Sequence, residues 1–401
     1  MDVILFASDN HTFGYLRNVY KELKHQNYKS CFLYMDSSHD LNYDSTHPVD
    51  FTSPNPVNSL NVNLPFIPDY LIISKDRWFP EQNVIQEFKT YYPKTKIVYI
   101  EMNCYLHNSI EIRMERISQS KPPQNLIDIV FNHSKYSLKN KDEALKLKTQ
   151  ETNIVVGNPY WDNLNINNIE RVYTKYKIDK SKTQLLFFST GNFTRKETFK
   201  CFNYISDNID RDKYQIYFKP TPGEINHPLY KNDYIPQFII NGIDGIIFEQ
   251  EDLTYMNYIC DYHIGNISSV NYGGVLYKKQ LVSLHKATKL YENFNNLDFF
   301  LSNFKNVREN WTSDFWLKIH NLKSQQEFID LVNPHNLEVF EETNKNWAKV
   351  LKNNTHTFDY TLDFLNSPPK NTLKLMGYFN DYNDNKASSR IVDYLKNNLD
   401  S

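Results

Sequence analysis

The chain has 401 residues, which is more than one ordinary hydrophobic core accommodates, so two domains are expected. Hydrophobic residues make up 40% and aromatic residues 15% of the chain, which excludes an intrinsically disordered protein. The formal net charge of −2 argues against a general nucleic-acid-binding protein, although it leaves room for a local basic pocket that binds one nucleotide.

The spacing of cysteines and of apolar residues excludes further classes. No two cysteines form a Cys-x-x-Cys pair, so neither a zinc site nor a disulfide framework is predicted. No stretch reaches the roughly 18 consecutive apolar residues of a membrane span, and the chain opens without a basic leader, which together predict a cytoplasmic protein. The glycine motifs of dinucleotide-binding loops and P-loops are absent. The cysteines, expected to be small buried side chains in a reducing compartment, are Cys31, Cys104, Cys201 and Cys260.

The first half of the chain alternates apolar strands with helices. Continuous apolar runs predict buried strands, and apolar residues at intervals of three or four predict helices. Strands separated by helices indicate a parallel, doubly wound sheet. The predicted strands are 3–7, 30–35, 69–74, 96–100, 127–131 and 153–156, the predicted helices are 13–23, 83–91 and 137–147, and a loop is expected over 40–66.

A second alternating series follows a charged, weakly apolar stretch at 163–182 that is typical of a connector. Two such series in succession predict an α/β fold of two Rossmann-like domains that face each other across a cleft. Ligands of these sheets bind beyond the carboxyl ends of the strands. The predicted strands are 185–189, 215–219, 245–248, 260–265 and 280–284, and the predicted helices are 196–209, 253–259, 297–304, 311–320, 324–331, 344–352 and 387–395.

These patterns predict four parts of the chain. The first domain is expected over 1–160, a connector over 161–182 and the second domain over 183–375. The amphipathic helix within 376–401 is expected to return to the first domain.

A pair of serines gives the first indication of chemistry. Ser268 and Ser269 follow the predicted strand 260–265 and precede a helix, which places two hydroxyls and several N–H groups at a helix N-terminus. That end of a helix carries roughly half a positive charge and suits a phosphate. A simple helix cap is the alternative for Ser268. Lys219 ends the strand 215–219, where two nearby prolines stiffen the backbone at the edge that is expected to bind ligand.

Four stretches resemble one group of enzymes. IYFKPTPGE and CDYHIGNISSVNYGGVLYKKQLVSL are similar to segments of GT-B transferases close to CDP-glycerol glycerophosphotransferases and bacterial sialyltransferases. IVVGNPYWDNL resembles a stretch at the domain junction that UDP-N-acetylglucosamine 2-epimerases share, and NDNKASSRIVDYL looks like the closing helix of the group. The four stretches occur in the expected order over 154–395. The first domain, where these families hold the acceptor, matches in strand pattern only.

The resemblance implies a donor site in the second domain. Ser268 and Ser269 would meet the donor phosphates. Thr221 stands where the family has a histidine, and its neutral hydroxyl cannot replace a charged imidazolium, so Lys219 or Arg195 would have to stabilise the leaving phosphate, or catalysis is impaired. The other residues that the resemblance places around the nucleotide are Lys219, Pro220, Gly191, Asn192, Thr194 and Arg195.

The acceptor hydroxyl needs a base from the first domain. Related enzymes place a histidine or glutamate just after the fourth strand, which points to Glu101, although a helix cap or salt bridge explains a carboxylate there more readily than a base does. His11 is an alternative because histidine is a poor helix cap and this one precedes a helix. Asp9 and His107 are further candidates.

The resemblance implies transfer of a sugar or a polyol phosphate from a nucleotide-activated donor to a glycan or lipid-linked acceptor. Surface polysaccharides such as capsule, teichoic acid and lipooligosaccharide are the expected products, without a metal, a cofactor or a nucleic-acid partner. Peripheral association with the inner face of the membrane is compatible with such acceptors. One alternative is a UDP-sugar 2-epimerase, although the H-x-E-A-G pattern of that family is absent. The other is a non-catalytic nucleotide-sugar-binding protein, which Thr221 favours.

Overall fold

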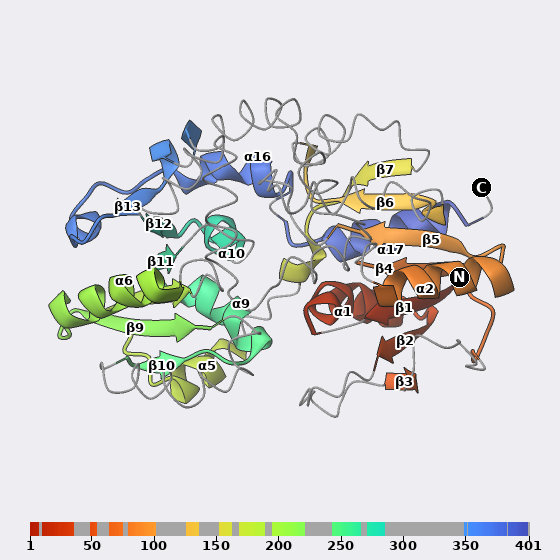
Figure 1. The fold of residues 1–401 in the computed structure, drawn as a ribbon, viewed down its shortest axis with the longest axis horizontal. Helices are drawn as coiled ribbons and strands as arrows, with labels where there is room; N and C mark the ends of the chain where they lie inside the picture. The colour runs from red at the N-terminus through yellow and green to blue at the C-terminus, as the bar shows by residue number, and fades with distance from the viewer. Residues whose placement is uncertain are drawn as a thin grey trace, which may run out of the picture. The chain divides into compact units, whose positions relative to one another are not determined.

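The computed structural model contains two units, each built around a parallel β-sheet (Figure 1). The first unit comprises Met1–Asn163 and Gly377–Ser401, and the second comprises the described residues between them. The structure describes residues 1–7, 10–35, 49–53, 64–74, 79–101, 126–135, 152–162, 168–188, 195–220, 243–265, 271–284, 349–350, 352–382 and 384–399.

The sheet of the first unit has seven strands in the order β3-β2-β1-β4-β5-β6-β7. Every neighbouring pair is parallel. The chain winds outward in one direction from β1 to β3 and in the other from β4 to β7, so the strand order reverses between β1 and β4. The strands are β1 (Asp2–Ala7), β2 (Lys29–Met35), β3 (Val49–Ser53), β4 (Tyr70–Ile73), β5 (Lys96–Ile100), β6 (Ile129–Asn132) and β7 (Thr152–Val155).

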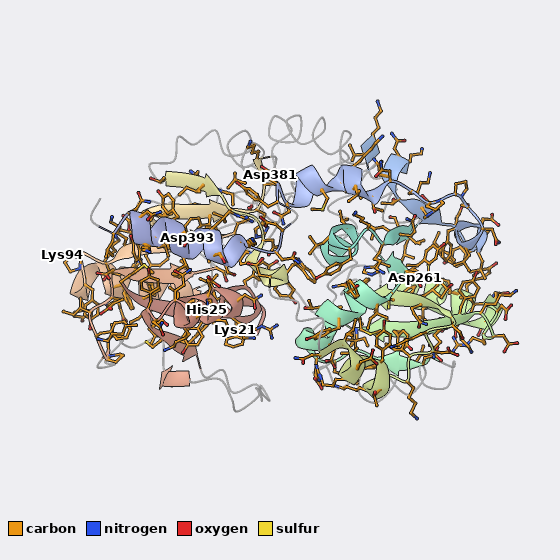
Figure 2. All side chains as sticks on the ribbon, turned by 180° about the vertical axis from the view of Figure 1, so that it is seen from behind. Lys21, His25, Lys94, Asp261, Asp381 and Asp393 are labelled. Atoms are coloured by element: carbon orange, nitrogen blue, oxygen red, sulfur yellow. The ribbon has the colours of Figure 1, made fainter. Side chains whose placement is uncertain are left out.

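Helices cover both faces of this sheet because its central strands are apolar on both sides. Side chains alternate between the faces of a strand, so Val3 and Leu5 of β1 join one core cluster and Ile4 and Phe6 join another. The first cluster includes apolar residues of α1 (Asn10–His25) and α17 (Ala387–Asn397), and the second includes those of α2 (Phe79–Tyr91). Lys21 and His25 lie on the exposed face of α1 (Figure 2).

The sheet of the second unit has six parallel strands in the order β10-β9-β8-β11-β12-β13, which reverses between β8 and β11. Leu185 and Phe187 of β8 pack with α6, and Leu186 and Phe188 pack on the opposite face with α5 and α9. The strands are β8 (Thr183–Phe188), β9 (Tyr214–Lys219), β10 (Gly245–Ile246), β11 (Tyr262–Gly265), β12 (Gln280–Leu284) and β13 (His356–Phe358). The helices are α5 (Ile169–Lys175), α6 (Arg195–Asn208), α9 (Gln250–Ile259) and α10 (Asn271–Leu276), with short helical turns η6 (Asp363–Leu365) and η7 (Thr372–Leu375). The short helical turn η2 (Pro159–Trp161) belongs to the first unit, and α16 (Met376–Phe379) begins at the boundary between the units.

Three elements differ from the sequence-based expectation. The expected loop over 40–66 contains the edge strand β3, whose five residues pair with β2. The expected connector over 161–182 contains α5, whose Val172 is fully buried in the core of the second unit. The part of the chain after residue 297 was predicted to contain helices alone. It includes the strand β13, which extends the second sheet beyond β12. The predicted helices 137–147, 297–304, 311–320 and 324–331 lie outside the described residues, as does most of 344–352.

A buried carboxylate joins the two ends of the first unit. The Asp162 carboxylate accepts hydrogen bonds from the backbone N–H groups of Ala387, at 3.2 Å, and Ser388 at the start of α17. Arg390, one turn further along, donates from Nε to the Val156 carbonyl at 2.7 Å. Two of the stretches that resemble the GT-B group therefore contact each other, although Asp162 and Ala387 are 225 residues apart.

The remaining sequence-based expectations concern cysteines and membrane spans. Cys31, Cys201 and Cys260 are buried as expected, and Cys104 lies outside the described residues. Within the described part of the chain, no helix combines the length and the apolar character that a transmembrane segment requires.

Candidate functional site

The carboxyl edge of the second sheet brings four strand ends together. Phe188 of β8 pairs with Lys219 of β9, and Gly265 of β11 pairs with Ser283 of β12. β8 and β11 are themselves paired, so the point at which the strand order reverses lies between Phe188 and Gly265. A Cβ atom at Gly265 would lie 3.1 Å from the Phe188 carbonyl oxygen, so a side chain here would crowd the neighbouring strand. In open α/β sheets this reversal point is where ligands bind.

Lys219 lies at this edge, as the sequence predicts, but its ammonium folds back onto the chain. The side chain is buried, and Nζ donates a hydrogen bond to the carbonyl oxygen of Pro220 at 2.7 Å. Pro220 is buried as well. The ammonium is therefore held at the strand end by the adjacent rigid residue.

Most of the other predicted donor residues lie outside the described part of the chain. These are Gly191, Asn192, Thr194, Thr221, Ser268 and Ser269. Arg195 is the first residue of α6, and its side chain is not among those described. Of the predicted donor set, the structure thus places Lys219 and Pro220 at the carboxyl edge.

The carboxyl edge of the first sheet carries a second group of polar residues. Ser74 follows β4, Glu101 follows β5 and His133 follows β6, and all three are fully buried. The Glu101 carboxylate accepts a hydrogen bond from the backbone N–H of His133, with Oε2 3.1 Å from the nitrogen. The backbone N–H of Glu101 donates to the carbonyl of Phe131 at 2.9 Å. Glu101 is therefore fixed between its own strand and β6.

His133 is a member of this group that sequence reasoning missed. Its ring stacks on Tyr15 of α1, with the centroids 6.0 Å apart and the planes 9° from parallel. Burial lowers the pKa of His133 to about 3, so the imidazole is neutral at pH 7. The available signal was the position of Asn132-His133-Ser134 directly after an apolar strand, which corresponds to that of Glu101 after the preceding strand.

The side chains of the other three base candidates lie outside the described part of the structure. His11 is the second residue of α1, but only its backbone is described. Asp9 and His107 lie outside the described residues. Of the four candidates, Glu101 is therefore the one whose side-chain burial and contacts the structure describes.

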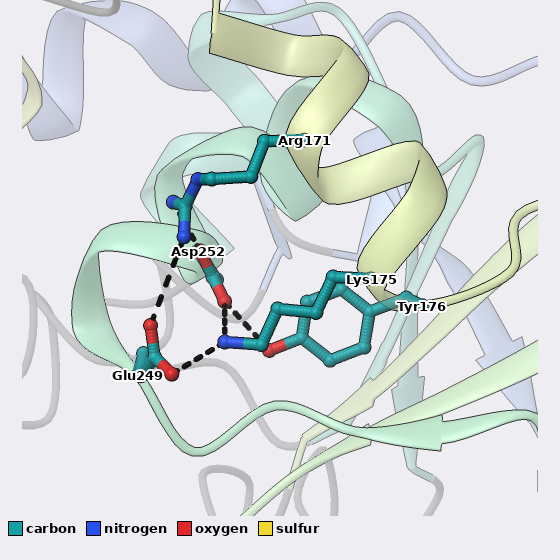
Figure 3. Close-up of polar contacts among 5 residues, drawn as sticks. All are labelled: Arg171, Lys175, Tyr176, Glu249 and Asp252. Atoms are coloured by element: carbon teal, nitrogen blue, oxygen red, sulfur yellow. Dashed lines mark hydrogen bonds and ion pairs between the residues drawn. The ribbon is translucent and has the colours of Figure 1, made fainter.

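A separate charged cluster ties α5 to α9 (Figure 3). The fully buried Asp252 carboxylate accepts hydrogen bonds from Arg171 Nη2 at 2.7 Å, Lys175 Nζ at 2.7 Å and Tyr176 Oη at 2.8 Å. Glu249 contacts both cations, so two positive charges meet two negative charges. Burial and the hydrogen bond to Asp252 raise the pKa of Tyr176 well above its usual range. The charges of this cluster are balanced, and its contacts connect α5 to α9.

The two parallel sheets define an α/β fold of two Rossmann-like domains, and the similar solved structures have a GT-B-type fold. No protein-family model matches the chain, and no curated protein matches its sequence. A variant of the wall teichoic acid polymerase TagF soaked with CDPG superposes with a TM-score of 0.52 at 12% identity, covering 99% of this chain and 88% of that one.

Two further solved structures are similar over their whole length. MnaA from S. aureus, solved with UDP, has a TM-score of 0.56 at 14% identity, and the match covers 100% of this chain and 97% of the MnaA chain. A putative UDP-N-acetylglucosamine 2-epimerase from Listeria monocytogenes has a TM-score of 0.55 at 11% identity, with coverage of 100% and 96%. At these identities the likeness shows the fold alone. It confirms the predicted fold class, and it confirms the resemblance to the GT-B enzymes as a likeness of fold.

Proposed function

We propose that the protein is a GT-B-type transferase that moves a sugar or a polyol phosphate from a nucleotide-activated donor to a hydroxyl of a surface polysaccharide. The observation that carries this proposal is the reversal of strand order between β8 and β11, with Lys219 at the end of the adjacent strand. This is the place where open α/β sheets bind nucleotides. The names of two similar structures include nucleotide ligands, CDPG and UDP.

The donor site is proposed to use the chain segments that leave this edge. The segment with Ser268 and Ser269 begins where β11 ends and finishes where α10 starts, and Gly191 and Asn192 lie between β8 and α6. Hydroxyls, backbone N–H groups and a lysine ammonium can together stabilise the negative charge of a departing diphosphate. A phosphate oxygen is a stronger acceptor for the Lys219 ammonium than the neutral Pro220 carbonyl it now contacts.

Glu101 is proposed as the base that removes the acceptor proton. Its carboxylate is oriented by the N–H of His133, and general-base catalysis requires such a fixed orientation. His133 itself is unsuited to this role because its pKa of about 3 makes it a weak base.

One alternative is a UDP-sugar 2-epimerase, which the similarity to the Listeria structure favours. The residues after β5 argue against it, because Glu101 is not part of an H-x-E-A-G pattern. A non-catalytic nucleotide-sugar-binding protein is the other alternative, because Thr221 replaces the histidine of the resembling transferases.

A thermal-shift panel of CDP, UDP, GDP and CMP tests the donor site. Ligand at 100 times its Kd should stabilise the protein by about 2.7 kcal/mol. Lys219→Ala should weaken binding by about tenfold to a hundredfold, because a hydrogen bond to a charged group is lost. Lys213→Ala is the matched control, because Lys213 precedes the opposite end of β9 and is exposed beside Asp210. Failure of all four nucleotides to bind would overturn the proposal.

Product analysis with a panel of nucleotide-activated donors separates the three functions. A transferase releases the nucleotide, slowly with water and faster with its acceptor. A 2-epimerase interconverts two UDP-sugars and leaves the nucleotide attached to the sugar. A binding protein shows affinity but neither product, which would refute the enzymatic proposal. Ser269→Ala should reduce nucleotide release from the donor.

A further inference from the structure

Part of the segment between α16 and α17 contacts the carboxyl ends of β6 and β7. Asp381 (Figure 2) is exposed in this segment. Its backbone N–H donates to the His133 carbonyl at 3.4 Å, and its carboxylate accepts a hydrogen bond from the backbone N–H of Lys135 at 3.1 Å. Tyr382 Oη donates to the Val155 carbonyl of β7 at 3.3 Å. Asp381 therefore ties this segment at two points to the turn that follows β6.

Contacts on both sides of Asp381 hold it in place. Asn380 is buried, and its Oδ1 accepts a hydrogen bond from the Tyr382 backbone N–H at 3.2 Å. The Arg390 guanidinium lies 3.8 Å from the centre of the Tyr382 ring, and Arg390 also donates to the Val156 carbonyl at the end of β7. The carboxylate of Asp381 is thus presented to the turn after β6 by residues that are themselves anchored on the sheet.

The same turn holds the proposed base. The backbone N–H of His133 donates to Glu101 Oε2 at 3.1 Å, and the His133 carbonyl accepts from Asp381. The His133 ring stacks on Tyr15. A hydrogen bond from a backbone N–H orients its acceptor only as firmly as the donating residue is held. The chain of contacts therefore runs from Asp381 through the turn to the Glu101 carboxylate.

We propose that Asp381 is a positioning residue for Glu101, acting through the turn that contains His133 and Lys135. This inference rests on the proposed function, in which Glu101 removes the acceptor proton. The carboxylate supplies the shorter of the two ties to the turn, because the N–H contact of 3.4 Å is long beside the usual distance of about 2.9 Å.

The expected effect is on catalysis rather than on donor binding. A misplacement of about 1 Å in a catalytic site can cost up to about a hundredfold in rate. Asp381→Ala removes one of the two ties and leaves the other, so we expect a loss of about tenfold in kcat. The Kd for the nucleotide should not change, because the proposed donor site belongs to the other unit.

The test measures nucleotide release with water as the acceptor. The probes are CDP-glycerol, UDP-N-acetylglucosamine, GDP-mannose and CMP-sialic acid, and circular dichroism confirms that each variant is folded. Asp381→Asn is expected to recover most of the kcat that Asp381→Ala loses, because the amide oxygen can still accept the Lys135 N–H. Calorimetric titration with CDP, UDP, GDP and CMP measures the Kd of each variant.

Asp384→Ala is the matched control. Asp384 is an exposed aspartate of the same segment, but its carboxylate accepts hydrogen bonds from Arg390 Nη1 at 2.7 Å and from the Lys386 backbone N–H at 3.2 Å. The substitution removes the same charge without touching the turn after β6. The wild-type kcat is expected.

A double-mutant cycle with Glu101→Gln shows whether Asp381 acts through the base. If it does, Asp381→Ala causes little further loss once Glu101 has been replaced. A merely structural contribution of Asp381 would lower kcat by the same factor in both backgrounds.

The outcomes separate this inference from the function on which it rests. Wild-type protein that releases nucleotide from none of the four donors would overturn the transferase function and this inference with it. Full activity in Glu101→Gln would remove the base and also the inference. Wild-type kcat in Asp381→Ala, an equal loss in Asp384→Ala, or an equal factor in the two backgrounds of the cycle would overturn the inference alone.

Discussion

Replacing Asp162 by asparagine is expected to remove a pH dependence of stability that this carboxylate creates. Asp162 is buried beneath the start of α17, and burial raises its pKa from 3.8 to about 6, although Ser388, Ala387 and Arg390 oppose the shift. The folded protein therefore binds a proton at this site more tightly than the unfolded chain does. The resulting stabilisation is complete below pH 3.8 and is lost as the pH rises through about 6.

The magnitude follows from the two pKa values. A difference of about two units corresponds to about 3 kcal/mol between the limits of low and high pH. Between pH 7 and pH 5, Asp162 should add about 1.3 kcal/mol to the free energy of unfolding. Asparagine cannot titrate, so the difference in stability between the wild type and Asp162→Asn should change by that amount over the same range. Other titrating groups cancel from this difference.

Urea denaturation at pH 7 and pH 5 measures the effect. Tryptophan fluorescence provides the signal, and one of the five tryptophans, Trp161, is buried next to Asp162. Asp393→Asn removes one exposed negative charge from the same helix and controls for net charge (Figure 2). An unchanged difference between pH 7 and pH 5 would refute the reasoning. A change of opposite sign would show that the attraction of Arg390 outweighs the cost of burial.

Three further substitutions have defined expectations. Asp252→Ala should lower the free energy of unfolding by about 1–3 kcal/mol in urea titrations, because a buried carboxylate is lost while Arg171 and Lys175 are exposed enough to regain water. Gly157→Ala should cost about 1–3 kcal/mol, since φ is +92° and the new Cβ would lie 2.7 Å from Asn380 Oδ1. Gly377→Ala, which meets no atom within 4 Å, is its control, and equal stability of the two variants would contradict the argument. Under the proposed function, Glu101→Gln should keep nucleotide affinity and lose at least about a hundredfold in donor hydrolysis, whereas a matching loss of affinity would contradict a role as base.

The success of the sequence-based prediction differs between elements for physical reasons. The central strands β1 and β8 are apolar on both faces, so continuous apolar runs revealed them. The helix α5 was missed because its charged residues looked like those of a linker, and the partner of Arg171, Asp252, is 81 residues away in the chain. The strand β13 has three residues and depends on pairing with β12, which no local pattern reveals.

The candidate site shows the same division between local and long-range information. The place of Lys219 at a strand end followed from its neighbours in the sequence, whereas its contact with the Pro220 carbonyl depends on the local conformation. The partnership of Glu101 with His133 depends on β5 and β6 being adjacent, which requires the strand order.

The anchoring of α17 on Asp162 has a consequence for biosynthesis. The ribosome adds Ala387 225 residues after Asp162, so the first unit lacks part of its core while the second unit is being made. Until Ile391, Val392 and Leu395 emerge, the apolar residues of α1 and β1 that they cover remain accessible to water and to chaperones. The second unit, whose strands follow one another in the chain, can complete its sheet first, and the first unit completes its core when α17 arrives.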